Sequence, residues 1–335
     1  MNMKENINIS FVVIAKNEIF TIHKCISSII KAGNRANDYE IIYVDSASTD
    51  GTLEVVSDIN SVKIRVFRIT KNPNSAVARN IGIKHTKYDY IFFIDGDVVI
   101  KPNFAKSAIS EALESDETGI VFGKLKEIQY NDEHKKIIKI VQDREKISKR
   151  SYRKSAGGIF LTKKSIIDKV GNFDERLRVN QDWDFAFRVG KKYKILALPE
   201  KMGTHHTVTY RDIKRIKNII LSGQRLYLGF LIRKYLLQPG IVFFIIKLVY
   251  GVILGGIFWI LLIFSFLTSS LLLKLVCVLF IIIDILLGVR KERGNLVGRM
   301  VDHYIVPFFI LAGFLFYFPK KKEVEWEEVK KESRI

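Results

Sequence analysis

Cysteine is scarce in this sequence, with two residues among 335. Cys25 lies in a stretch of mixed polarity and Cys277 lies deep in an apolar run, so a disulfide between them is not expected. This excludes a disulfide-stapled fold and is typical of a reducing, cytosolic setting. The first ten residues are polar and contain no apolar stretch before a cleavage site, so we expect no secretory signal.

Acidic residues are also few, because 35 Asp and Glu face 54 Lys and Arg, which gives a formal net charge of +19. Such an excess predicts an anionic partner. The basic pairs Arg233-Lys234 and Arg290-Lys291 flank apolar runs, where anionic lipid head groups would meet them. We see no interleaved basic and aromatic motif of an RNA or DNA module, so membrane lipids are expected as partners and nucleic acid is not.

Long apolar runs are confined to the last third of the chain. Residues 241–267 are long enough to cross a hydrocarbon layer, for which about 20 helical residues suffice, and residues 271–288 are at the lower limit. The tight turn between them predicts a transmembrane helical hairpin, and the basic loop that follows favours a multi-pass protein of the cell membrane with its first domain in the cytoplasm. Residues 304–318 contain Pro307 and are expected to be re-entrant or interfacial.

The sequence therefore predicts four parts. An α/β domain occupies residues 1–209. A basic amphipathic helix at 210–238 lies in the membrane interface or packs in a core. A membrane region at 239–318 precedes a charged tail at 319–335.

Within residues 1–209, short runs rich in Ile, Val and aromatic residues alternate with stretches of helical periodicity. The predicted strands are 7–14, 41–44, 62–69 and 90–94, and the predicted helices are 18–31, 49–59 and 75–85. This alternation predicts a mostly parallel sheet with helices on both faces, in which ligands bind beyond the carboxyl ends of the strands. The charged stretch 127–154 is expected to be a solvated helix or a loop.

Two carboxylates, Asp95 and Asp97, directly follow the fourth predicted strand, with Gly96 between them. Mg²⁺ or Mn²⁺ takes hard oxygen ligands and is readily shared between carboxylates and phosphates. Gly96 allows the backbone to approach a ligand closely. The sequence therefore predicts a site for a metal-bound diphosphate at this strand end.

Other strand ends supply further candidates. Asp45 follows the second strand and is predicted to accept hydrogen bonds from a nucleotide. Arg79 is expected to neutralise a phosphate or to pair with Asp95, and the two roles are compatible. Small and polar groups follow the first strand beside the same cleft, namely Ala15, Asn17 and Glu18.

The order of the motifs along the chain is more specific than any one of them. Four motifs resemble the nucleotide-binding half of family 2 glycosyltransferases, which have the Rossmann-like GT-A fold: Val12–Glu18, Val44–Thr52, Ala78–Asn80 and Asp95–Asp97. Three more resemble the acceptor half of that family: Gly157–Phe160, Val170–Glu175 and Gln181–Arg188. The resemblance covers about residues 7–210.

The resemblance implies roles for single residues. It places Ala15, Asn17, Asp45 and Arg79 at the nucleotide site. Asp95 and Asp97 would hold the metal and the diphosphate, and His205 or His206 would complete the metal shell. Gly158, Asp174 and Trp183 belong to the acceptor half, where Trp183 either stacks on a sugar or is buried.

Asp182 corresponds to the general base of the family, and Asp184 is the alternative base or an ion-pairing residue. Gln181 stands where the family usually has Glu, which removes a charge beside the base. The implied reaction is the inverting transfer of a sugar from a nucleotide-sugar, expected to be a UDP-sugar, to a lipid-linked or cell-envelope glycan, with Mn²⁺ or Mg²⁺ as cofactor.

Two alternatives stay open. One is a polyprenyl-phosphate glycosyltransferase, whose acceptor is a lipid phosphate. The other is a non-catalytic membrane protein that binds nucleotide-sugars. A metal-dependent nucleotidyltransferase is not expected, because its Gly-rich basic loop near the N-terminus is absent. The sequence gives no indication of the oligomeric state.

Overall fold

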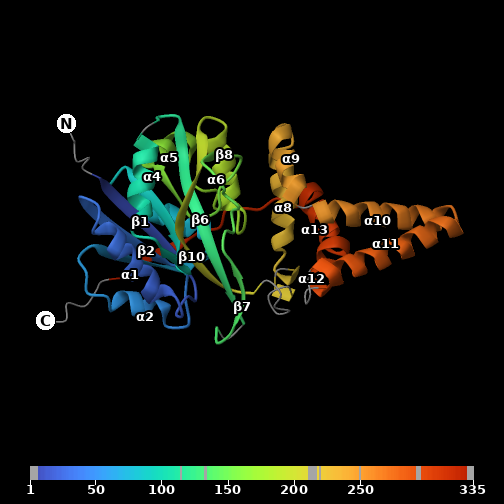
Figure 1. The fold of residues 1–335 in the computed structure, drawn as a ribbon, viewed down its shortest axis with the longest axis horizontal. Coiled ribbons are helices and arrows are strands. Elements are labelled where there is room, and N and C mark those ends of the chain that lie inside the picture. The colour runs from blue at the N-terminus through green and yellow to red at the C-terminus, as the bar shows by residue number, and fades with distance from the viewer. Residues whose placement is uncertain are drawn as a thin grey trace. The chain divides into compact units, whose positions relative to one another are not determined.

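The protein divides into two compact units, Met1–Thr209 with Lys320–Ile335, and Tyr210–Pro319. Figure 1 shows this computed structural model as a ribbon. The structure describes residues 7–113, 115–131, 134–209, 217–218, 220–248, 250–291 and 296–329.

The first unit is an α/β domain. Its strands are β1 (Asn8–Ala15), β2 (Asp38–Asp45), β3 (Ile64–Lys71), β4 (Tyr90–Asp95), β5 (Val98–Ile100), β6 (Thr118–Tyr130), β7 (Ile137–Val141), β8 (Ser151–Arg153), β9 (Phe160–Lys163), β10 (Lys194–Val208) and β11 (Glu325–Glu328). Its helices are α1 (Ile22–Gly33), α2 (Thr52–Ser57), α3 (Ser75–His85), α4 (Phe104–Leu113), α5 (Lys164–Val170) and α6 (Gln181–Gly190).

These strands form one sheet in the order β11-β3-β2-β1-β4-β9-β6-β10-β5, with β7 paired to β6 and β8 to β10. The strands β3, β2, β1 and β4 run parallel, as the alternation of strands and helices predicts. β9 is antiparallel to both β4 and β6, and β5 and β11 form antiparallel edges. The prediction of an α/β sheet with helices is confirmed, but the sheet is mixed rather than mostly parallel.

Helix α3 is fixed against the middle of the sheet by close backbone packing. A Cβ atom on Gly82 would lie 2.2 Å from Cγ1 of Val12, a fully buried residue of β1. The helix begins at a side-chain cap, because Asn74 Oδ1 accepts the Val77 N–H at 2.9 Å. This packing holds Arg79, one turn into α3, at the carboxyl ends of the central strands.

The charged stretch 127–154 contains strand segments as well as the expected loop, and its described residues form no helix. β6 continues to Tyr130, and β7 pairs with it in antiparallel fashion. From Lys124 on, β6 alternates between partly exposed and buried residues: Lys124 and Lys126 lie on the partly exposed face, and Glu127 and Gln129 on the buried one.

The charged tail contributes the edge strand β11, which the sequence does not predict. It pairs with β3, where Arg65 binds Glu328 through Nε at 2.9 Å and Nη2 at 3.1 Å. Trp326 packs edge-on against Phe67, with ring centroids 5.8 Å apart. The end of the described chain is therefore part of the first unit.

The second unit is helical. Its helices are α8 (Gln224–Lys234), α9 (Pro239–Leu248), α10 (Tyr250–Leu267), α11 (Leu271–Lys291), α12 (Leu296–Tyr304) and α13 (Val306–Leu315). α8 packs so closely on α13 that a Cβ atom on Gly229 would lie 2.0 Å from the Ile310 carbonyl oxygen. Arg233 Nη1 also donates to the Phe314 carbonyl at 2.6 Å. These contacts pack α8 against α13, and residues 210–216 and 219 of the predicted helix 210–238 lie outside the described part.

Among the described residues, no helix has both the length and the apolar character that crossing a membrane requires. The predicted span 241–267 is divided between α9, of 10 residues, and α10, of 18 residues. The predicted span 271–288 lies in α11, which carries Lys274 and Asp284, and Asp284 is bound to His303 at 2.9 Å. The predictions of a transmembrane hairpin and of a multi-pass location in the cell membrane are therefore wrong.

Candidate active site

A cleft of about 320 Å³ lies at the carboxyl ends of β1 and β4. The predicted site residues that line it are Ala15, Glu18, Arg79, Asp95, Gly96, Asp97, Gly158 and Asp182. Residues that were not predicted as ligands also line it, namely Ile14, Lys16, Ser46, Pro73, Asn74, Ser75 and Gln181. The remaining predicted residues lie outside this lining: Asn17, Asp45, Asp174, Trp183, His205 and His206.

Arg79 and Asp95 form an ion pair at one wall of the cleft. The distance from Arg79 Nη2 to Asp95 Oδ1 is 2.7 Å, and the guanidinium lies over the Phe173 ring at 5.4 Å. Arg79 is buried, yet its Nε and Nη1 find no hydrogen-bond partner among the described residues. Desolvation raises the pKa of Asp95, and Arg79 opposes this shift. Of the two predicted roles of Arg79, the pairing with Asp95 is present, and the binding of a phosphate stays a prediction.

Gly158 and Gly96 have no side chain, which leaves room for the charged groups and the strand ends at this wall of the cleft. A Cβ atom on Gly158 would lie 2.4 Å from Arg79 Nη2, and a Cβ atom on Gly96 would lie 2.6 Å from the Cβ of Ala15. A larger residue at either position would therefore push the charged groups or the strand ends apart.

Asp97 binds the imidazole of His205, with 2.9 Å between its Oδ2 and Nε2 of the ring. His206 points elsewhere, because neighbouring strand residues face opposite sides of a sheet. Its Nδ1 lies 2.9 Å from the Tyr130 hydroxyl, and the two rings are stacked. The structure thus separates the two candidate histidines, and only His205 reaches the carboxylates.

Burial disfavours a charged imidazole at His205, but Asp97 and Glu127 overcome this and raise its pKa to about 9. The Oδ1 atom of Asp97 is buried and has no hydrogen-bond partner among the described residues. A carboxylate oxygen without a partner beside an imidazole nitrogen is a donor set that a divalent cation accepts. Across the described ranges, no group of three or more His, Cys, Asp or Glu residues is arranged to hold a metal ion. Any cation would therefore need ligands from a bound diphosphate.

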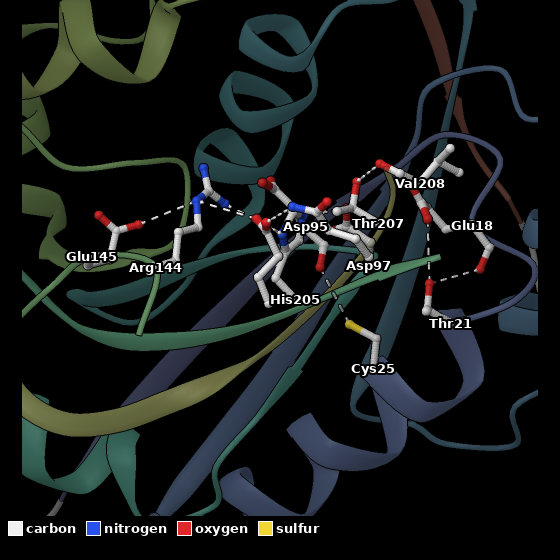
Figure 2. Close-up of polar contacts among 12 residues, drawn as sticks. Glu18, Thr21, Cys25, Asp95, Asp97, Arg144, Glu145, His205, Thr207 and Val208 are labelled. Carbon is white, nitrogen blue, oxygen red and sulfur yellow. Dashed lines mark hydrogen bonds and ion pairs between the residues drawn. The ribbon is translucent and has the colours of Figure 1, made fainter. Parts of the chain in front are cut away.

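Glu18 adds a further acidic group to the cleft, as Figure 2 shows together with the Asp95, Asp97 and His205 cluster. Burial, and then the neighbouring charges of Asp97 and Asp95, raise the pKa of Glu18 to about 8. Its position is fixed because its N–H donates to Thr52 Oγ1 at 2.8 Å. The clustering of acidic groups favours either a proton or a cation at this place.

Asn17 and Asp45 form hydrogen bonds to the loop that follows β2. Asp45 is fully buried, and its Oδ2 accepts the Ser48 N–H at 2.8 Å. Asn17 has a φ of 58°, and its Oδ1 accepts the Thr49 N–H at 2.8 Å. Both side chains thus hold the loop after β2, and their predicted contact with a nucleotide stays a prediction.

The opposite wall begins at α6. Asp182 lines the cleft in its first turn, and burial raises the pKa of this carboxyl. Its neighbour Gln181 is 8% exposed, and its Oε1 has no hydrogen-bond partner among the described residues. Asp184 is fully buried and binds Arg188 Nε at 3.0 Å. Asp184 is thus an ion-pairing residue, which leaves Asp182 as the carboxylate that faces the cleft.

The other predicted acceptor-binding residues contact their neighbours in the chain. Asp174 binds Arg176, with 2.8 Å between Oδ2 and Nη2. Trp183 is half-buried beside Asp182. The backbone N–H of Trp183 donates to Asp182 Oδ1 at 2.9 Å. Neither side chain lines the cleft, so only Gly158 of the predicted acceptor residues does so.

Residues 10–173 match the family model described as Glycosyl transferase family 2. This match covers just under half of the chain, and over these residues the protein is similar to glycosyltransferase family 2. The mixed α/β sheet and the acidic cleft at its strand ends agree with this assignment.

Among curated proteins, the chain is similar to the uncharacterized glycosyltransferase YwdF of Bacillus subtilis, with 26% identity over 57% of this chain and 71% of that protein. It is also similar to the poly(ribitol-phosphate) beta-N-acetylglucosaminyltransferase TarP of Staphylococcus aureus, with 37% identity over 23% of this chain and 24% of TarP. The match thus spans about a quarter of TarP. A crystal structure of S. aureus TarS 1–349 in complex with UDP superposes with a TM-score of 0.50 and 19% identity over 65% of both chains, which supports the fold alone.

Proposed function

We propose that this protein transfers a sugar from a UDP-sugar to a hydroxyl group of a cell-envelope glycan or polymer, with inversion at the anomeric carbon. The family 2 domain supports glycosyl transfer. The names of the relatives support the substrates, since TarP is a poly(ribitol-phosphate) N-acetylglucosaminyltransferase and another relative is a poly-beta-1,6-N-acetyl-D-glucosamine synthase. The single observation that carries the proposal is that Arg79, Asp97 and Asp182 line one cleft.

The donor diphosphate would lie against Arg79 and Asp97. Arg79 offers two buried nitrogens without a partner among the described residues, and a guanidinium recognises phosphate oxygens in a fixed geometry. Asp97 and His205 would hold Mn²⁺ or Mg²⁺ together with the diphosphate. When bound, the cation offsets the negative charge that builds up on the leaving nucleoside diphosphate.

Asp182 would act as the general base. Its raised pKa makes it a stronger proton acceptor than an exposed Asp, because a base works best when its pKa approaches the working pH. It lines the same cleft as the diphosphate groups, so an acceptor hydroxyl held there would lose its proton to Asp182 while its oxygen attacks the anomeric carbon. Attack from the face opposite the leaving group produces inversion.

The test uses purified protein with Mn²⁺ and a panel of radiolabelled UDP-sugars, including UDP-N-acetylglucosamine, incubated with poly(ribitol phosphate) and with membranes as acceptors. Asp182→Asn is expected to bind UDP normally and to lose transfer, whereas Asp168→Asn, an exposed residue of α5, serves as the control. Retained transfer by Asp182→Asn into an acid-labile, organic-soluble product would instead favour a lipid phosphate acceptor. Binding of UDP with no product from any donor would refute the enzymatic proposal.

A further inference from the structure

His205 lies between two carboxylates because of the strand register. β10 runs between β6 and β5, and His205 pairs with Glu127 on one side and with Val98, next to Asp97, on the other. Its Nε2 lies 2.9 Å from Asp97 Oδ2, and its Nδ1 lies 3.2 Å from Glu127 Oε2. The ring is therefore held at both nitrogens, and only the Asp97 side faces the cleft.

Glu127 is itself held in place. Its side chain is 4% exposed, and its Oε1 accepts a hydrogen bond from Gln129 Nε2 at 2.7 Å. Arg144 Nε lies 3.7 Å from Oε2. Figure 2 shows Arg144 beside the His205 cluster, on the side away from Glu18. The hydrogen bond from Gln129 and the nearby guanidinium of Arg144 hold this buried carboxylate in one orientation.

The neighbouring buried positions of β6 show where this face of the strand changes from apolar to polar. Leu125, Glu127 and Gln129 are buried residues of β6, and they face the same side because strand residues alternate. The face is apolar at Leu125 and becomes polar where it meets His205. Glu127 is the residue of this face that pairs with His205 across the two strands and contacts its ring.

We propose that Glu127 is a positioning residue for His205, accepting the Nδ1 proton so that Nε2 is the nitrogen available to the cation of the donor diphosphate. Metal-bound histidines generally donate their other N–H to a carboxylate, and loss of such a partner typically weakens metal binding about 10- to 100-fold. This inference rests on the proposed function, because it requires a cation at Asp97 and His205.

The experiment measures Mn²⁺ binding to the UDP-loaded protein from the electron paramagnetic resonance signal of free Mn²⁺. Glu127→Ala is expected to weaken binding about 10- to 100-fold, and Glu127→Gln, which keeps an acceptor oxygen without the charge, less. Glu54→Ala on the surface of α2 and His206→Ala are the matched controls and should bind like the unmodified protein. UDP affinity without metal and the melting temperature show whether each variant is folded.

The double variant Glu127→Ala/His205→Ala distinguishes positioning from general damage. If Glu127 acts through His205, the double variant binds Mn²⁺ no more weakly than His205→Ala alone. Additive losses would overturn the inference, as would folded Glu127→Ala with unchanged Mn²⁺ affinity. If Glu127→Ala does not fold, unchanged affinity in Glu127→Gln has the same meaning.

The outcome also separates this inference from the function on which it rests. If His205→Ala loses Mn²⁺ and both Glu127 variants keep it, the metal site stands and the positioning role is refuted. If the unmodified UDP-loaded protein takes up no Mn²⁺, the metal part of the proposed function fails, and the positioning role fails with it.

Discussion

Arg79 Nη2 lies 2.7 Å from Asp95 Oδ1 and 3.4 Å from the carbonyl oxygen of Gly158, so helix α3, strand β4 and the segment before β9 meet at one guanidinium. Arg79 is 2% exposed and packs over Phe173, so it cannot swing into solvent. The lack of a side chain at Gly158 therefore determines where the guanidinium of Arg79 lies in the cleft.

Gly158→Ala should displace this charge, because the added Cβ would come within 2.4 Å of Arg79 Nη2. We expect UDP affinity to fall about 10-fold, which corresponds to the loss of one charge-assisted contact. Calorimetric titration with UDP measures the effect. Gly157→Ala is a matched control, because nothing lies within 4 Å of a Cβ at that position. Equal UDP affinity in the two variants would contradict the role of this space.

Asp97→Asn should lower the transfer rate by at least about 100-fold and remove its dependence on Mn²⁺, because an amide oxygen is a much weaker ligand than a carboxylate. Treatment of the unmodified protein with EDTA should give a similar loss, reversed by added Mn²⁺. The measurement is the initial rate at several Mn²⁺ concentrations. Full activity of the unmodified protein in EDTA would rule out the metal dependence.

The pH profile should report the raised pKa of Asp182. A protonated carboxyl cannot take up the proton of the acceptor hydroxyl group, so kcat/KM should fall as the pH drops through the pKa of Asp182. The midpoint of this fall should lie above the ordinary pKa of Asp, which is about 3.9. Rates between pH 4 and 9 would show the midpoint. A profile without an acidic limb, or the same limb in the residual activity of Asp182→Asn, would assign the base elsewhere.

Glu18 should make stability depend on pH. Its pKa is about 8 in the folded protein and near the ordinary value of 4.5 when unfolded, so between these values the folded state binds the extra proton. The free energy of unfolding should therefore decrease as the pH rises from about 4.5 to about 8. Denaturant unfolding at a series of pH values measures the slope in the metal-free protein. Glu18→Gln should flatten it, whereas Glu54→Gln on the surface should leave it unchanged.

Trp326→Ala should destabilise the first unit, because Trp326 packs on Phe67 and on His85 at the edge of the sheet. The side chain is half-buried, so we expect a loss of about 2 kcal/mol in the free energy of unfolding. Glu327→Ala, an exposed residue of the same strand, is the control. An unchanged melting temperature in Trp326→Ala would show that β11 adds little to stability.

Much of the first half of the sheet was predictable from the sequence because the signals are local. Apolar runs ending in Asp45 and Asp95 mark strand ends, and carboxyl ends of parallel strands meet at one edge. The same reasoning predicted Arg79 beside Asp95, and the structure has that ion pair. The roles of these residues in binding and catalysis stay predictions.

Other features depend on contacts between distant segments. The approach of Glu127 to His205 joins residues 78 positions apart, and it requires the register of β6 and β10. The same register explains why His205 and not His206 faces Asp97. The membrane hairpin was wrong for a related reason, because the length of an apolar run does not reveal that it is divided between α9 and α10 or that Asp284 pairs with His303.

Because β11 pairs with β3, the chain leaves the first unit before residue 210 and returns to it after residue 319. A protease that cuts the backbone once between residues 210 and 319 would therefore not release the fragment that carries β11. That fragment would stay attached through the strand pairing and the Arg65–Glu328 bridge. Limited proteolysis followed by gel filtration without denaturant should thus give one peak that separates into two bands only when the protein is unfolded.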